Sequence, residues 1–486
     1  MLLSSSDAAA NLPDALVDLR ARLQLLPSND PVAALADLAV LLETLREASS
    51  TALPDVASAL SLIDEAAQPP LRHALKGFLQ AAALKSGRGE ILRTASVRHF
   101  KQLSDACRHA LQQGRYDHAD QPLLLAEMAT RALRAQAGHL KWDHLVYGPY
   151  DDTLWRRAGA ILLEAIEERR HDLPVRLRQG RDTETSTLRE MARVLALHCS
   201  GLNQLPIELI DIADRIIHYL LPTLHIGPTL SEGTRFYWVP ADGAAPLRIV
   251  RGEADVPGAW FFSPRQADSA MTELESMLHK GMVPGILDGS VGARERALAC
   301  IRHLRRAWCD APVSRRHRRH AMGGRIAAIK GFVALRRALK DGGLDAERWD
   351  LRDASVNGMG VVAPSVESEL PKIGDLVAVR PDENGAWRLG MVRRVARDDD
   401  LSAFVGLETF ASAPRMVRAD DGRAPVDILL CDPLHRGGIL RVISPTNSLR
   451  EGAPLFVAEN GAIQKLKPLG APWRGSEFEV RTYLVL

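Results

Sequence analysis

The sequence predicts a multi-domain α+β protein with an all-helical N-terminal half, a C-terminal antiparallel β-barrel and an additional β module. Two observations predict this organisation. Through residues 1–225, apolar residues recur at three- and four-residue spacing, as in VAALADLAVLLETLREA (32–48), which is typical of amphipathic helices. After Pro222, short apolar runs alternate with Gly, Pro and Asp turns, which is typical of antiparallel strands.

Further helical stretches follow the first one. No fixed-period repeat relates them, so we expect an irregular helical bundle and not a solenoid. Their predicted ranges are 71–85, 91–113, 122–140, 154–170, 187–200 and 206–221.

The length of the chain predicts several domains, because 486 residues exceed one ordinary core. We expect the additional β module either to extend the barrel or to pair with earlier strands at 235–262. The predicted divisions are a helical domain at 1–225, a mixed β-strand and helix segment at 226–311, a β-barrel at 312–415 and a C-terminal β module at 416–486.

Strand patterns dominate the barrel region and the module after it. A helical piece, FVALRRALKDGG (332–343), is predicted between the first two barrel strands. The barrel strands are predicted at 324–329, 349–353, 358–363, 375–380, 387–396 and 402–410, and those of the module at 426–431, 438–443, 453–458 and 478–486.

The bulk composition excludes several classes of protein. Lys and Arg total 62 against 60 Asp and Glu, a formal net charge of +2, which argues against a dedicated nucleic-acid binder. The five cysteines form no CxxC pair, which argues against a disulfide framework or a zinc ribbon. We find no secretion signal and no apolar run of membrane-spanning length. These observations predict a cytoplasmic protein.

The sharpest local feature is the run RRHRR, which contains Arg315, Arg316, Arg318 and Arg319. Arginine carries a planar fork of donors that grips a phosphate or the O6/N7 edge of guanine, and its flat face stacks on bases. Taken alone, the run also fits a solvated basic segment or the end of the preceding helix, where cations are favoured.

A second feature is DASVNG at 353–358, which fits the pattern D-x-S-x-x-G. Asp353 is able to accept hydrogen bonds from guanine N1–H and its exocyclic amine, and Ser355 offers a hydroxyl. Gly358 permits a turn and lets the backbone approach a ligand. Taken alone, the segment also fits a plain hairpin turn.

Together, in this order and with strands following, the two features resemble the PilZ family over residues 312–411. RRHRRH resembles that family's RxxxR loop, and WDLRDASVNGMGVVAP resembles its second and third strands. The resemblance implies a cyclic di-GMP receptor. It implies that Arg315 and Arg319 contact phosphates and guanines, with Arg316 and Arg318 as secondary candidates. It also implies that Asp353, Ser355 and Gly358 hold a guanine edge.

We therefore expect a receptor in which cyclic di-GMP orders the 312–324 loop and thereby affects a helical output domain. No catalytic or P-loop motif is present, so we expect no enzyme activity, no cofactor and no metal. Two alternatives stay open. One is a nucleic-acid-associated regulator that uses the basic run for phosphates; the other is a scaffold with a degenerate barrel.

A protein partner is expected through the helical half. One candidate surface is the aromatic-rich segment HLKWDHLVYGPYDDTLW (139–155), because large aromatics are enriched at protein interfaces. The alternative is a packed corner between two helices, with Gly148 and Pro149 in the turn.

Overall fold

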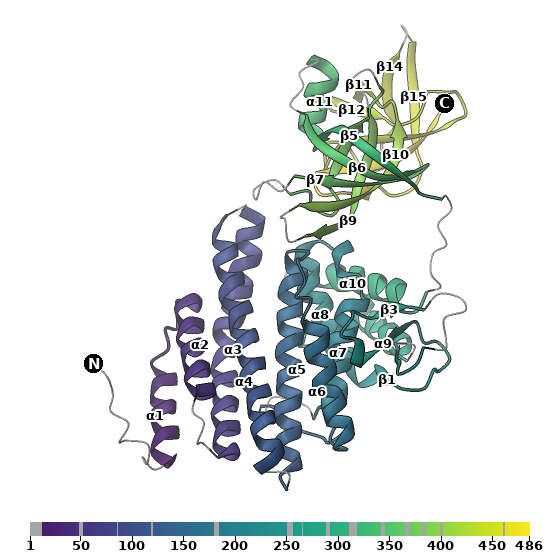
Figure 1. The fold of residues 1–486 in the computed structure, drawn as a ribbon. Coiled ribbons are helices and arrows are strands. Elements are labelled where there is room, and N and C mark those ends of the chain that lie inside the picture. Colours follow the sequence, from purple (N-terminus) through teal and green to yellow (C-terminus); the bar gives the residue numbers. More distant parts are fainter. Residues whose placement is uncertain are drawn as a thin grey trace. The chain divides into compact units, whose positions relative to one another are not determined.

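The computed structural model divides the chain into two compact units, each described here by itself (Figure 1). The helical unit comprises Met1–Val146, Tyr150–Leu202 and Ile207–Pro312, and the barrel unit comprises Val313–Leu486 with two short earlier segments. The four-part division stays a finer prediction. The structure describes residues 12–47, 52–84, 86–117, 120–178, 184–249, 256–264, 266–287, 292–310, 318–341, 346–364, 370–381, 385–398, 402–459 and 462–486.

The N-terminal half is helical, as predicted. The long helices α3, α4 and α5 run beside one another (Figure 1). The helices are α1 (Leu12–Gln24), α2 (Pro31–Glu47), α3 (Leu53–Leu84), α4 (Arg88–Asp117), α5 (Pro122–Leu145), α6 (Leu154–Glu167), α7 (Thr187–Cys199) and α8 (Ile207–Leu220), with short 3-10 turns at Leu202–Gln204, Leu221–Thr223 and Pro240–Asp242.

Local chemistry accounts for two of the helix starts. Before α2, the Asp30 carboxylate accepts hydrogen bonds from the backbone N–H groups of Val32 and Ala33, at 3.0 and 3.1 Å. Before α7, Ser186 accepts from the N–H of Arg189 at 3.3 Å. Each cap satisfies donors that the first helical turn leaves without an intrahelical partner.

A small sheet and two helices complete the helical unit. The strand order is β1-β4-β2-β3, all antiparallel. Phe262 of this sheet packs edge-on against Trp308, with ring centroids 6.3 Å apart. The elements are β1 (His225–Gly227), β2 (Phe236–Trp238), β3 (Leu247–Arg248), β4 (Trp260–Ser263), α9 (Ala267–His279) and α10 (Ala293–Trp308).

The first barrel of the barrel unit is closed and antiparallel, in the order β10-β7-β6-β5-β8-β9. The predicted helical insert is present as α11 (Phe332–Asp341), between the first two strands. The first strand begins at His320, so the segment 320–324, expected to be part of a loop, is strand. The barrel strands are β5 (His320–Lys330), β6 (Glu347–Ser355), β7 (Gly358–Ala363), β8 (Leu376–Arg380), β9 (Arg388–Arg397) and β10 (Ala403–Ser412).

The C-terminal module is a second closed arrangement, because β13 pairs with β17 as well as with β12 in the order β13-β12-β11-β14-β15-β17-β16. It neither extends the first barrel nor pairs with strands at 235–262, so both of those expectations are wrong. Its strands are β11 (Arg415–Asp420), β12 (Pro425–Leu430), β13 (Ile439–Pro445), β14 (Leu455–Glu459), β15 (Ala462–Pro468), β16 (Trp473–Arg474) and β17 (Phe478–Val485).

The two barrels share a hydrophobic core. Ile428 and Leu430 belong to the core of the second barrel, whereas Leu429 between them joins a cluster with Leu376 and Leu389 of the first. Side chains alternate between the faces of a strand, so the second half of β12, Ile428 to Leu430, is buried on both sides. This burial explains why its sequence is an almost continuous apolar run.

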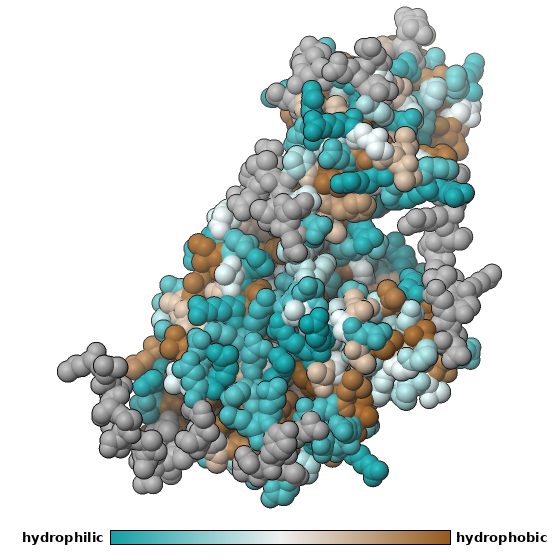
Figure 2. Space-filling model, viewed as in Figure 1, coloured by the Kyte–Doolittle hydropathy of each residue, from teal (hydrophilic) through white to brown (hydrophobic). Residues whose placement is uncertain are grey.

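The surface of the helical unit that Figure 2 displays is mostly hydrophilic, with hydrophobic residues scattered among hydrophilic ones. This distribution is ordinary for helices that bury one face each. Within the described residues, no helix combines the length and the apolar composition needed to cross a bilayer.

Candidate nucleotide-binding site

A β-bulge positions the acidic residue of the site. Trp349 and Leu351 of β6 are buried, and strict alternation would place Asp353 on their face, toward the barrel interior. The register of β6 against β7 shifts between Leu351 and Asp353, so Asp353 lies opposite Gly360 on the other face. Bulges commonly re-aim side chains in this way beside functional sites.

Four of the predicted site residues lie together at this end of the barrel. Arg319 donates through Nη1 to Asp353 Oδ1 at 2.8 Å. Ser355 donates through Oγ to the carbonyl of Gly358 at 3.3 Å. A Cβ built on Gly358 would lie 3.4 Å from Arg319 Nη2 and 3.7 Å from Ser355 Oγ. The two sequence patterns, 34 residues apart from Arg319 to Asp353, therefore meet in space.

The remaining predicted residues are the other arginines of the run. Arg318 is described and exposed, and no contact brings it to the Asp353 carboxylate. Arg315 and Arg316 lie outside the described residues. Of the four arginines, Arg319 is the one that the described structure joins to the D-x-S-x-x-G segment.

Two glycines that are not among the residues expected from the sequence, Gly360 and Gly406, lie beneath the polar group. Gly360 of β7 pairs with Gly406 of β10, and Gly406 pairs in turn with Arg394 of β9. A Cβ on Gly360 would lie 2.9 Å from both Asp353 carboxylate oxygens. A Cβ on Gly406 would likewise lie 3.3 Å from Arg394 Cβ, so the two glycines leave space that the Asp353 and Arg394 side chains occupy. The spacing GMG at 358–360 was the available signal, but its meaning depends on strand register.

The turn at the end of the β6–β7 hairpin is anchored to the neighbouring strand. Thr409 of β10 donates its N–H to the carbonyl of Asn357 at 3.1 Å. Val356 at the tip is 72% exposed. This hydrogen bond therefore holds the hairpin end, and with it Ser355 and Gly358, against β10.

The electrostatics of the site favour recognition over structural stabilisation. The Arg319 and Asp353 side chains are each 28% exposed, and ion pairs this accessible contribute only about 0–1 kcal/mol to stability. The pair is nevertheless preorganised, with further N–H donors on Arg319 directed by a fixed guanidinium plane. Such an arrangement presents both a donor and an acceptor to a heterocyclic base.

The described residues contain no group of three or more His, Cys, Asp or Glu side chains able to hold a metal ion.

The aromatic-rich segment is mostly interior. Trp142 and Trp155 are 3% and 6% exposed. Trp142 packs against Phe78, and Trp155 packs against His198 and Trp238 within the helical unit. These contacts favour the packed corner over a partner-binding face.

The fold and the site define a class of protein: a helical region joined to β-barrels, one of which carries a polar site on its outer face. Residues 17–229 match the model of a family described as cyclic-di-GMP receptor FimW, N-terminal domain. The match lies in the helical half, covers less than half of the chain and supports the cyclic di-GMP receptor class. No curated protein and no solved structure matches the chain.

Proposed function

We propose that this chain is a cytoplasmic cyclic di-GMP receptor of the PilZ type, without enzymatic activity, whose ligand site is centred on Arg319 and Asp353. The observation that carries the proposal is the gathering of Arg319, Asp353 and Ser355 around Gly358. The family match in the helical half supports the same ligand independently, because it involves none of these residues.

Each group in the site has a role that its chemistry fits. The Asp353 carboxylate accepts from guanine N1–H and the exocyclic amine, which together present two donors to two oxygens. Ser355 adds a hydroxyl at the base edge. Gly360 leaves the space in which the Asp353 carboxylate lies, and the guanidinium of Arg319 stacks on the base or donates to a phosphate.

The remaining arginines of the run, Arg315, Arg316 and Arg318, supply charge-assisted bonds to the phosphates, with Arg315 the foremost of them. Ligand binding orders the segment that leads into β5 against the outer face of the barrel. A ligand shifts a conformational equilibrium only by its differential affinity for the two states. The free energy of these phosphate contacts shifts the receptor toward its ligand-bound conformation. That shift is how the signal reaches the helical region and a protein partner there.

Calorimetric titration of the full chain with cyclic di-GMP tests the proposal. Arg319→Ala and Asp353→Ala should each weaken binding about 10-fold to 100-fold, since each leaves a charged hydrogen-bonding partner unmatched at a cost of about 1–3 kcal/mol. No heat with cyclic di-GMP at concentrations suited to micromolar affinity would refute the proposal and leave a scaffold with a degenerate barrel.

Matched controls exist on β5, which directly follows Arg319, and on β6, which carries Asp353. Arg325 and Asp350 form a looser pair, with Nε and Oδ1 4.0 Å apart, and both side chains are largely exposed. Arg325→Ala and Asp350→Ala should bind cyclic di-GMP as the wild type does. Titrations with GTP and a duplex oligonucleotide complete the test. Duplex binding that depends strongly on salt and is unchanged in Asp353→Ala would instead indicate a nucleic-acid-associated regulator.

A further inference from the structure

The helical unit contains a cavity of about 180 Å³, remote in sequence from the barrel site. This volume has room for several water molecules, each of which takes about 30 Å³ in the liquid. Its wall includes apolar side chains of α3 and α4 and the ring of Trp142 from α5. Its polar lining is dominated by basic residues, namely Arg72, Arg131, Arg134, Lys141, Arg178 and Arg193.

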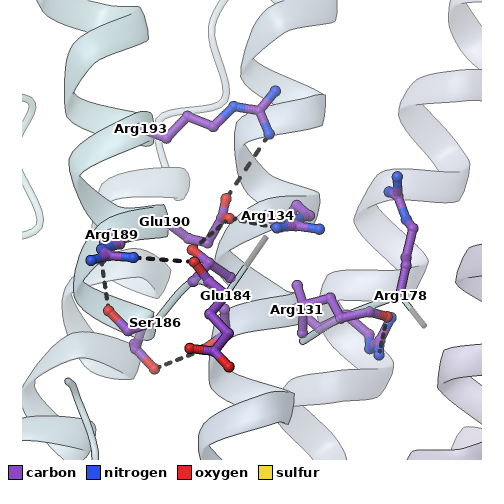
Figure 3. Close-up of polar contacts among 12 residues, drawn as sticks. Arg131, Arg134, Arg178, Glu184, Ser186, Arg189, Glu190 and Arg193 are labelled. Carbon is purple, nitrogen blue, oxygen red and sulfur yellow. Dashed lines mark hydrogen bonds and ion pairs between the residues drawn. The ribbon is translucent and has the colours of Figure 1, made fainter. Parts of the chain in front are cut away.

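The carboxylates around the cavity hold this basic group in a fixed arrangement. Arg134 and Arg193 point toward Glu190, with Arg131 and Arg178 nearby (Figure 3). The Arg134 Nη2 lies 2.9 Å from Glu190 Oε1, and Arg193 Nη2 lies 2.8 Å from an oxygen of Asp214. The basic side chains are therefore already in position before any ligand arrives. This preorganisation lowers the entropic cost of binding a ligand.

The same carboxylates keep the cations charged despite burial. Burial lowers the pKa of Lys141, but the charges of Asp214 and Asp211 outweigh that effect and leave the pKa raised. The Lys141 ammonium lies 2.5 Å from Asp211 and 3.0 Å from Asp214. Burial also lowers the pKa of Arg193, but the charges of Asp214 and Glu190 outweigh that effect and leave its pKa raised.

The pairing leaves buried donors unused. The side chain of Arg131 is 0% exposed, and its Nε has no hydrogen-bond partner in the described part of the chain. The Nε of Arg193 is in the same condition, and Arg193 makes a single described hydrogen bond although a guanidinium carries five N–H donors. Both Nε atoms are buried from solvent, whereas the Arg193 side chain as a whole is 13% exposed, so a ligand in the cavity would meet Arg193 through its terminal N–H groups.

A groove of about 440 Å³ adjoins the cavity. Arg72 and Leu75 line both spaces, so the two lie side by side. It adds the basic residues Lys76, Arg215 and Arg296 against the acidic Glu208 and Asp211. The lining of the groove therefore carries more basic than acidic residues, which favours an anion near the cavity.

We propose that this cavity binds a phosphoryl group, carried either by free phosphate or by a small nucleotide. A phosphoryl group supplies several acceptor oxygens in a tetrahedral arrangement, which suits convergent guanidinium donors from different helices. The proposal does not depend on the barrel site. It assigns to the helical region a ligand of its own.

The test uses Arg72→Gln in the full chain, because Arg72 is exposed and its loss leaves the buried pairs intact. Sodium phosphate and AMP are titrated separately by calorimetry, with sodium chloride holding the ionic strength constant. Saturable binding of at least one probe is expected, weakened about 10-fold by Arg72→Gln. Binding of phosphate itself identifies the free anion as sufficient, and binding of AMP alone identifies an organic phosphate.

Arg98→Gln is the matched control, since Arg98 is an exposed arginine of α4 and is absent from the lining of both spaces. It should bind the probes as the wild type does, and circular dichroism should show both variants folded. Absence of binding by both probes at millimolar concentration would overturn the proposal. Equal weakening in both variants would overturn it too, because it would indicate general surface charge.

Discussion

The atoms nearest to a Cβ built on Gly360 are the two carboxylate oxygens of Asp353, each 2.9 Å away. Real Cβ contacts are essentially never so short, so any side chain at this position must displace the carboxylate. The backbone of Gly360 itself needs no unusual torsion, because its φ is not in the left-handed region. Glycine is therefore required at this position because the Asp353 carboxylate occupies the space of a side chain, and not because the backbone needs conformational freedom.

Gly360→Ala should therefore impair ligand binding more than stability. We expect cyclic di-GMP affinity to fall about 10-fold, because the Asp353 carboxylate loses its geometry toward both Arg319 and the guanine edge. Calorimetry measures the affinity, and the thermal midpoint measures the fold. Gly323→Ala on β5 is the control, since nothing lies within 4 Å of its added carbon. Unchanged affinity in Gly360→Ala would contradict the role given to Asp353.

This residue also marks the limit of reading the site from sequence. Arg319, Asp353, Ser355 and Gly358 were selected because residue type and short spacing were informative. Gly360 could not be selected in this way, because its contact with Asp353 depends on a bulge between Leu351 and Asp353. A bulge shifts register by one residue and leaves no distinct local pattern in the sequence.

At the scale of elements, helix α11 links the two barrels. Its residues Phe332 and Leu335 are 4% and 0% exposed. They pack in one cluster with Leu389 of the first barrel and with Leu429 and Ile443 of the second. On its exposed side, Arg336 and Lys340 approach Asp427 of β12, at 3.3 and 2.7 Å. Because these ion pairs are accessible, the apolar cluster supplies most of the connection.

Leu335→Ala should destabilise both barrels together. Removing a fully buried leucine side chain costs about 2–5 kcal/mol, which includes the cavity left behind. Hydrogen exchange on the full chain measures the effect, and protection should fall in β5–β10 and in β11–β17. Val333→Ala on the same helix is the control, because Val333 is 58% exposed. Loss of protection in one barrel alone would show that the barrels unfold independently.

The elements that could be predicted from the sequence are those with a clear local pattern of apolar residues. The amphipathic helices and most barrel strands were read from the spacing of apolar residues. Helix α3 was predicted only from residue 71 but begins at Leu53 and continues through Pro69 and Pro70. Proline disfavours a helix interior by about 3 kcal/mol, so the pair obscured the pattern that tertiary packing sustains. Closure of the second barrel depends on the long-range pairing of β13 with β17, which no local pattern reveals.

At the scale of the whole molecule, the proposed ligand site and the family match lie in different parts of the chain. The candidate site lies in the barrel unit, whereas residues 17–229, which match the cyclic di-GMP receptor family model, lie largely in the helical unit. A receptor must convert binding at one place into a change at another. Such coupling is a free-energy difference, typically about 1–3 kcal/mol, which requires two states that the ligand distinguishes.

Saturating cyclic di-GMP should therefore change amide exchange within residues 17–229 as well as around β5–β7. A coupling of about 1–3 kcal/mol corresponds to about a 5-fold to 150-fold change in the rate of exchange through the affected opening. Mass-spectrometric exchange on the full chain measures both regions in one experiment. At a ligand concentration that just saturates the wild type, the changes should become smaller together in Arg319→Ala, which binds more weakly, and should persist in Arg325→Ala. If protection changed around the barrel site alone, the helical region would be insensitive to the ligand, and the proposed signalling from barrel to helices would be wrong even with cyclic di-GMP bound.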